Sequence, residues 1–132
     1  MKFKILFSFI LSIALLGSVS AQNIELNGKN ITIHQDDVVI EVRGLVCSFC
    51  AIGLQGGLSS LQHIDKNKYK NGVFVDVEHQ YAVIAEIEGE DIDIEQAVAM
   101  ITGSGYEVTT VFTNRTSDKI EEWKIKGKKD ER

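Results

Sequence analysis

Two cysteines separated by two residues are the side chains of this sequence best suited to chemistry. Cys47 and Cys50 are the only cysteines among the 132 residues. A thiolate binds metal ions and attacks disulfides, and a pair at the start of a helix favours the thiolate, because unpaired N–H groups and the helix dipole stabilise its charge. The spacing alone leaves three interpretations open: a metal clip, a redox pair and a structural disulfide.

If the pair holds a metal, the number of ligands indicates which one. Two sulfur ligands suit soft cations that accept linear coordination, which favours Cu(I) or Hg(II) and permits Ag(I). Zn(II) fits less well, because it normally takes four ligands. The chain has no further cysteine, and His34, His63 and His79 fall in predicted loops or at strand ends. We expect these histidines to be solvated.

The redox alternative is an exported thiol-disulfide oxidoreductase in which Cys47 attacks a substrate disulfide and Cys50 resolves the mixed disulfide. Thioredoxin-like enzymes place a cis-proline opposite their cysteine pair, whereas this chain contains no proline. The structural alternative predicts little stabilisation, because a disulfide across so short a loop constrains the unfolded chain only slightly.

A strand and a helix are predicted on either side of the pair. Residues 38–43 nearly alternate apolar and polar side chains, which is typical of a half-buried strand. An apolar helix face then recurs at spacings of four, four and three in Cys50, Leu54, Leu58 and Leu61. Three glycines in this helix, Gly53, Gly56 and Gly57, each cost about 1 kcal/mol relative to alanine. We interpret Gly53 and Gly57 as sites of close packing. The alternative is that the first turn of the helix is loose without metal and becomes ordered when metal binds.

The remaining pattern completes an α+β domain. Residues 73–87 predict an antiparallel hairpin, Asp93 can cap a helix over residues 94–101, and residues 108–112 predict a last strand. The order strand, helix, strand, strand, helix, strand predicts a ferredoxin-like βαββαβ sandwich, with a four-stranded antiparallel sheet and two helices on one face.

Four segments are expected along the chain. Residues 1–21 read as a signal peptide, and residues 22–36 as an N-terminal extension that forms a hairpin around Asn27-Gly28 and could extend one edge of the sheet. Residues 37–113 form the domain. Residues 114–132 read as a solvated, charged tail in which Ile120 and Trp123 could dock one turn of helix.

The start of the chain predicts export. Lys2 and Lys4 precede an apolar run over residues 5–16 and the small-residue cleavage site Val19-Ser20-Ala21. The run is too short to span a bilayer, which takes about 20 residues. We expect a mature, periplasmic or secreted protein that begins at Gln22. The net charge of −5 argues against nucleic-acid binding, which depends on neutralising phosphates.

Two motifs resemble the heavy-metal-associated domain family, which includes copper chaperones and periplasmic mercuric-ion-binding proteins. The signature Gly-Met-Thr-Cys-x-x-Cys of that family corresponds to Gly44-Leu45-Val46-Cys47-Ser48-Phe49-Cys50, and its Gly-Tyr before the last strand to Gly105-Tyr106. The resemblance covers residues 38–112. It implies that Cys47 and Cys50 are the metal ligands, that Leu45 replaces a buried methionine and that Tyr106 lies near the metal loop.

The resemblance also implies a function. A non-enzymatic monomeric carrier would hold one soft ion and pass it to a membrane transporter or to another carrier. Leu45 keeps the volume and apolarity of methionine. Zinc-selective relatives often have an aspartate directly before the first cysteine, whereas Val46 offers no oxygen, which favours Cu(I) or Hg(II). The segment of residues 65–72 is longer than the link that the family usually has after the first helix. We therefore do not infer that the surface through which family members contact their partners is present there.

Overall fold

The computed structural model describes residues 22–116 and 119–125, and within them it contains seven strands and two helices. In chain order these are β1 (Gln22–Leu26), β2 (Lys29–Ile33), β3 (Asp37–Arg43), α2 (Ser48–Ser59), β4 (Val73–Asp76), β5 (Tyr81–Ala85), α3 (Ile94–Gly103), β6 (Glu107–Thr113) and β7 (Glu121–Lys124). None of the helices in these residues is long and apolar enough to cross a membrane. The predicted signal peptide and residues 117–118 and 126–132 of the predicted tail lie outside the described residues.

The main sheet has five strands, all antiparallel to their neighbours, in the order β4-β5-β3-β6-β7. A separate two-stranded sheet is formed by β1 and β2. The predicted ferredoxin-like sandwich with a single four-stranded sheet is therefore wrong for this chain. It lacked β7, which pairs with β6 from Thr110 to Thr113, and it lacked a second sheet.

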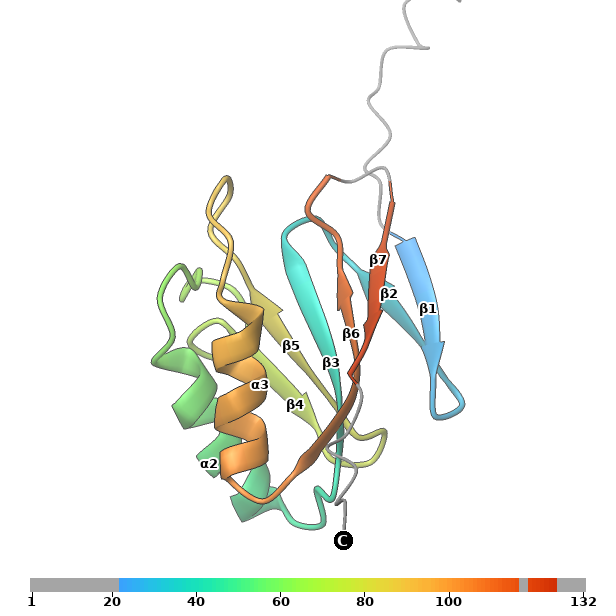
Figure 1. The fold of residues 1–132 in the computed structure, drawn as a ribbon, viewed down its shortest axis with the longest axis vertical. Coiled ribbons are helices and arrows are strands. Elements are labelled where there is room, and N and C mark those ends of the chain that lie inside the picture. The colour runs from blue at the N-terminus through green and yellow to red at the C-terminus, as the bar shows by residue number, and fades with distance from the viewer. Residues whose placement is uncertain (1–21, 117–118, 126–132) are drawn as a thin grey trace, which may run out of the picture.

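One face of the main sheet packs against both helices (Figure 1). Val38, Ile40 and Val42 of β3 point to this face, and they share one core with Leu54 and Leu58 of α2. The same core contains Ile94, Ala97 and Ile101 of α3. The apolar periodicities of strand and helix therefore meet as the sequence predicts, because residues two apart in a strand share a face.

The opposite face is covered by the β1-β2 hairpin, on the side of the sheet away from the helices (Figure 1). This second core is formed by Leu26, Ile31 and Ile33 of the hairpin with Val39, Tyr81, Val83 and Phe112 of the sheet. The prediction that the hairpin extends one edge of the sheet is therefore wrong. The prediction that β3 is half-buried is wrong as well. Its residues are buried on both faces up to Glu41 and Val42. The hairpin packs on this face because the apolar side chains of the sheet would otherwise be exposed to water.

The start of the predicted tail is ordered against the sheet. Arg115 lies 3.1 Å from Oε1 and 3.2 Å from Oε2 of Glu86, a side chain that is 1% exposed. Such a fork-shaped pairing gives a buried carboxylate the partner that it needs. Trp123 then lies in strand β7, so the predicted turn of helix at Ile120 and Trp123 is also wrong.

Candidate functional site: the two-cysteine loop

Cys47 and Cys50 lie where the chain leaves β3 and enters α2. Cys47 caps the helix: its backbone is extended, and its Sγ accepts a hydrogen bond from the Cys50 N–H at 3.2 Å. Cys50 occupies the first turn. The two Cα atoms are 5.3 Å apart, the sulfurs form a disulfide, and both side chains are partly exposed. The sequence placed one cysteine in the loop and the other in the helix, and the structure has this arrangement.

In the reduced state the same geometry would direct two thiols to one point beside a helix N-terminus. A thiolate there is stabilised by the helix dipole and by N–H groups such as that of Cys50. Two sulfurs close enough to bond to each other are also close enough to contact a single guest ion. The arrangement therefore permits both metal binding and thiol-disulfide exchange.

The loop before the cysteines is fixed to the core at two points. Gly44 has a φ of +97°, a conformation that favours glycine, and a Cβ added there would lie 3.6 Å from the Tyr106 ring. Leu45 is 3% exposed and belongs to the core on the helix side of the sheet. The positions of Leu45 and Tyr106 agree with what the family resemblance implied for them.

Gln80 is a site residue that the sequence analysis missed. It lies in the turn between β4 and β5, and its side-chain oxygen accepts hydrogen bonds from the N–H groups of Gly44 and Leu45, both at 3.0 Å. Its side-chain nitrogen donates to the carbonyl of Leu45 at 2.6 Å and to that of Val77 at 2.5 Å. A break in the apolar alternation at residues 79–81 was the only signal in the sequence, and it indicated a turn but no contact.

The segment that carries the cysteines exposes large apolar side chains and has no charged residue. Val46 and Phe49 are 83% and 84% exposed, and Ile52 is 58% exposed. No residue from Gly44 to Gln62 carries a charge. Exposed apolar side chains that lie together are typical of surfaces that contact other molecules.

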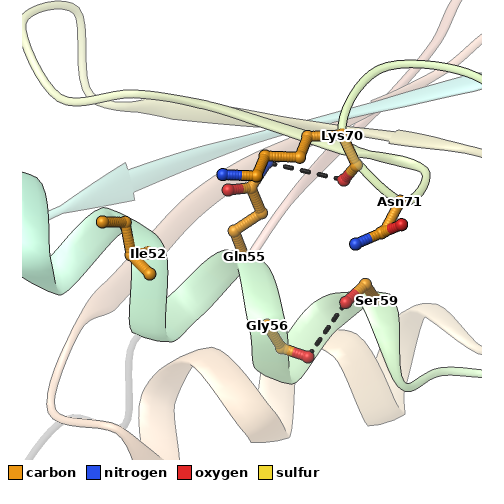
Figure 2. A pocket seen from close by; sticks show the side chains of 6 residues that line it. All are labelled: Ile52, Gln55, Gly56, Ser59, Lys70 and Asn71. Carbon is orange, nitrogen blue, oxygen red and sulfur yellow. Dashed lines mark hydrogen bonds between the residues drawn. The ribbon is translucent and has the colours of Figure 1, made fainter.

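A small hollow lies farther along α2, between this helix and the loop before β4. It has a volume of about 140 Å³, and Figure 2 shows the side chains that line it, namely Ile52, Gln55, Gly56, Ser59, Lys70 and Asn71. Gln55 donates to the carbonyls of Val73 at 2.6 Å and of Lys70 at 3.5 Å. Lys70 is the single titratable residue among those that line the hollow. The hydrogen bond from Gln55 to the Lys70 carbonyl attaches the loop of residues 65–72 to helix α2.

The histidines do not add a further ligand set. His34 is exposed, His63 lies 3.4 Å from Glu90, and Nδ1 of His79 lies 3.1 Å from Oδ2 of Asp76. In the part of the chain that the structure describes, no group of three or more His, Cys, Asp or Glu side chains is arranged to hold a metal ion.

The site and fold define a small α+β protein with an exposed cysteine pair at a helix N-terminus. No family model matches the chain, and no curated protein matches it. Among solved structures, the chain is similar to the crystal structure of oxidized MerP from Ralstonia metallidurans CH34. The TM-score is 0.45 and the identity 22%, and the similarity covers 55% of this chain and 92% of that one.

Proposed function

We propose that this chain is an exported carrier that holds one soft metal ion, Cu(I) or Hg(II), between Cys47 and Cys50. The observation that carries the proposal is the meeting of two partly exposed sulfurs at the N-terminus of α2. Soft thiophilic cations accept such a two-sulfur site. Export rests on the sequence pattern of residues 2–21.

Transfer would proceed by ligand exchange. An incoming thiolate from a membrane transporter or another carrier adds to the bound ion and gives a three-coordinate intermediate, after which Cys47 or Cys50 leaves. The partly exposed sulfurs support this route, because a partner thiolate can approach without opening the core. No acid-base or covalent catalysis is required, and we propose that the protein is not an enzyme.

A second candidate function is favoured by one observation, the disulfide between Cys47 and Cys50. An exported thiol-disulfide oxidoreductase would use this bond as its oxidised state, and Cys47 would attack a substrate disulfide after reduction. The two candidates differ in what the reduced pair does.

Titration of the anaerobically reduced chain from Gln22 with Cu(I), Hg(II) and Zn(II) separates them. We expect a tight one-to-one complex with a soft ion and much weaker Zn(II) binding. Cys47→Ser and Cys50→Ser should each lose the complex, because one sulfur cannot supply linear coordination. An insulin-reduction assay is run on the same samples. Strong catalysis without tight soft-metal binding would reject the carrier and favour the oxidoreductase.

A further inference from the structure

We infer that Gln80 is a positioning residue that holds the backbone before Cys47 in the geometry required for metal binding. The inference rests on the proposed function and deepens it, because it names the part of the fold that prepares the site. The four side-chain hydrogen bonds of Gln80 all go to backbone groups and not to a sulfur. Gln80 acts through the backbone of Gly44 and Leu45, the two residues that separate β3 from Val46 and Cys47.

The side-chain amide of Gln80 is fully engaged. Its oxygen accepts two N–H groups of the loop and its nitrogen donates to two carbonyls, one in the loop and one in its own turn. This pattern fixes which end of the amide faces which backbone group. The Gly44 and Leu45 N–H groups follow the end of β3, where the strand ladder no longer supplies partners, so Gln80 replaces that ladder for two residues.

The turn that presents Gln80 is itself anchored. The Gln80 carbonyl accepts the Val42 N–H at 2.9 Å, and Asp76 accepts the His79 N–H at 2.8 Å. From the other sheet, Asn27 donates to the His79 carbonyl at 2.7 Å, and Lys29 lies 3.0 Å from Asp76. The backbone of Gln80 adopts a φ of +57°, which is uncommon for a residue with a side chain. A residue keeps such a strained backbone conformation only where its surroundings hold it. For Gln80, these surroundings include the loop before Cys47.

The two halves of the cysteine pair are therefore supported differently. Cys47 follows a segment held by Gln80 and by the buried Leu45 side chain. Cys50 lies on helix α2, and the next turns of this helix contain Gly53 and Gly56. A Cβ added at either glycine would meet no atom within 4 Å, so no other element packs closely against the helix there. In other metal sites, partners that orient the ligands typically change metal affinity by 10- to 100-fold when they are replaced. Gln80 has that role here, one step farther from the ion.

The experiment compares Gln80→Met with Gln55→Met in the reduced, full mature chain. Gln80→Met keeps the length of the side chain and removes all four hydrogen bonds. Gln55→Met is the matched control, because the side chain of Gln55 also donates hydrogen bonds to backbone carbonyls of a loop, but those carbonyls belong to Lys70 and Val73 and not to the cysteine loop. Hg(II) and Cu(I) affinities are measured by competition with a chelator, at a temperature where all variants are folded. Amide exchange at Gly44 and Leu45 is measured in the metal-free protein.

We expect Gln80→Met to weaken soft-metal binding at least tenfold and to speed exchange at Gly44 and Leu45 at least tenfold. Gln55→Met should leave both within about twofold. Unchanged exchange in Gln80→Met would overturn the inference, and so would equal losses of affinity in the two variants, because a general loss of stability would then explain both. If the unmodified chain binds no soft metal, the proposed function fails, while exchange at Gly44 and Leu45 still decides whether Gln80 positions the loop.

Discussion

Two aspartates of this protein have pKa values shifted in opposite directions. Burial acts to raise the pKa of Asp76, but hydrogen bonds from the His79 amide, from Lys29 and from the His79 ring outweigh it and hold the pKa below its usual value. Burial raises the pKa of Asp37, although the Tyr69 hydroxyl and the His34 amide oppose the shift. One oxygen of Asp37 has no hydrogen-bond partner among the described residues. The two carboxylates should therefore affect acid stability differently.

The pH dependence of unfolding tests this. Asp76 stabilises the fold above the usual aspartate pKa of about 3.9, and this contribution is lost as the pH falls through the lower folded pKa. Asp37 destabilises the fold above its raised pKa, and this cost disappears as the pH falls below the usual value. We measure the free energy of unfolding in urea at pH 7 and at pH 3. The decrease from pH 7 to pH 3 should be smaller for Asp76→Asn than for the parent chain, and larger for Asp37→Asn. Parallel curves for all three proteins would refute both assignments.

At the scale of single elements, helix α2 contains glycines with different surroundings. A Cβ added at Gly57 would lie 3.3 Å from Sδ of Met100, whereas one added at Gly53 or Gly56 would meet nothing within 4 Å. The prediction of close packing is thus confirmed for Gly57 and wrong for Gly53. Exposed glycines inside a helix lower its stability, because they add freedom to the unfolded chain.

Alanine substitutions in this helix should separate the two environments. Gly53→Ala and Gly56→Ala are each expected to raise the free energy of unfolding by about 0.5–1 kcal/mol, measured by urea denaturation of the oxidised chain. Gly57→Ala serves as the comparison and should gain less, since Met100 must move. A gain at Gly57 as large as the gain at Gly53 would show that Met100 does not restrict this position.

Local patterns of the sequence predicted most elements but not their assembly. Strands β3, β4, β5 and β6 and both helices follow from apolar spacing, and the Asn27-Gly28 turn predicts the β1-β2 hairpin. Strand β7 has the sequence Glu-Glu-Trp-Lys, which shows no apolar alternation, and it forms because β6 leaves an edge to pair with. The location of the hairpin depends on distant residues. Apolar side chains at both Val38 and Val39 were a signal that β3 is buried on two faces.

The same division applies to the candidate site. Cys47 and Cys50 are neighbours in sequence, so their meeting at a helix start could be predicted. Gln80 is 36 residues away from Gly44, and its contact requires the β4-β5 turn to lie beside the end of β3. That arrangement follows from sheet order, which spacing alone did not establish.

At the scale of the whole molecule, the β1-β2 hairpin should contribute strongly to stability, since it covers an apolar sheet face. Ile33 is fully buried in this contact, and Ile33→Ala is expected to lower the free energy of unfolding by about 2–5 kcal/mol. Asn30→Ala, at an exposed position of the same strand, should change it by less than about 0.5 kcal/mol. Urea unfolding measures both. Similar small effects would mean that the hairpin rests on the sheet without stabilising it.

The central strand β3 also constrains how the protein can be made. Its neighbours are β5 and β6, and β6 ends at Thr113, far along the chain from β3. Contacts between such distant segments form slowly, because the chain must lose the entropy of closing a long loop before these contacts can stabilise it. A ribosome must therefore synthesise β6 before the middle of the sheet can assemble, and until then the nascent polypeptide has no complete core.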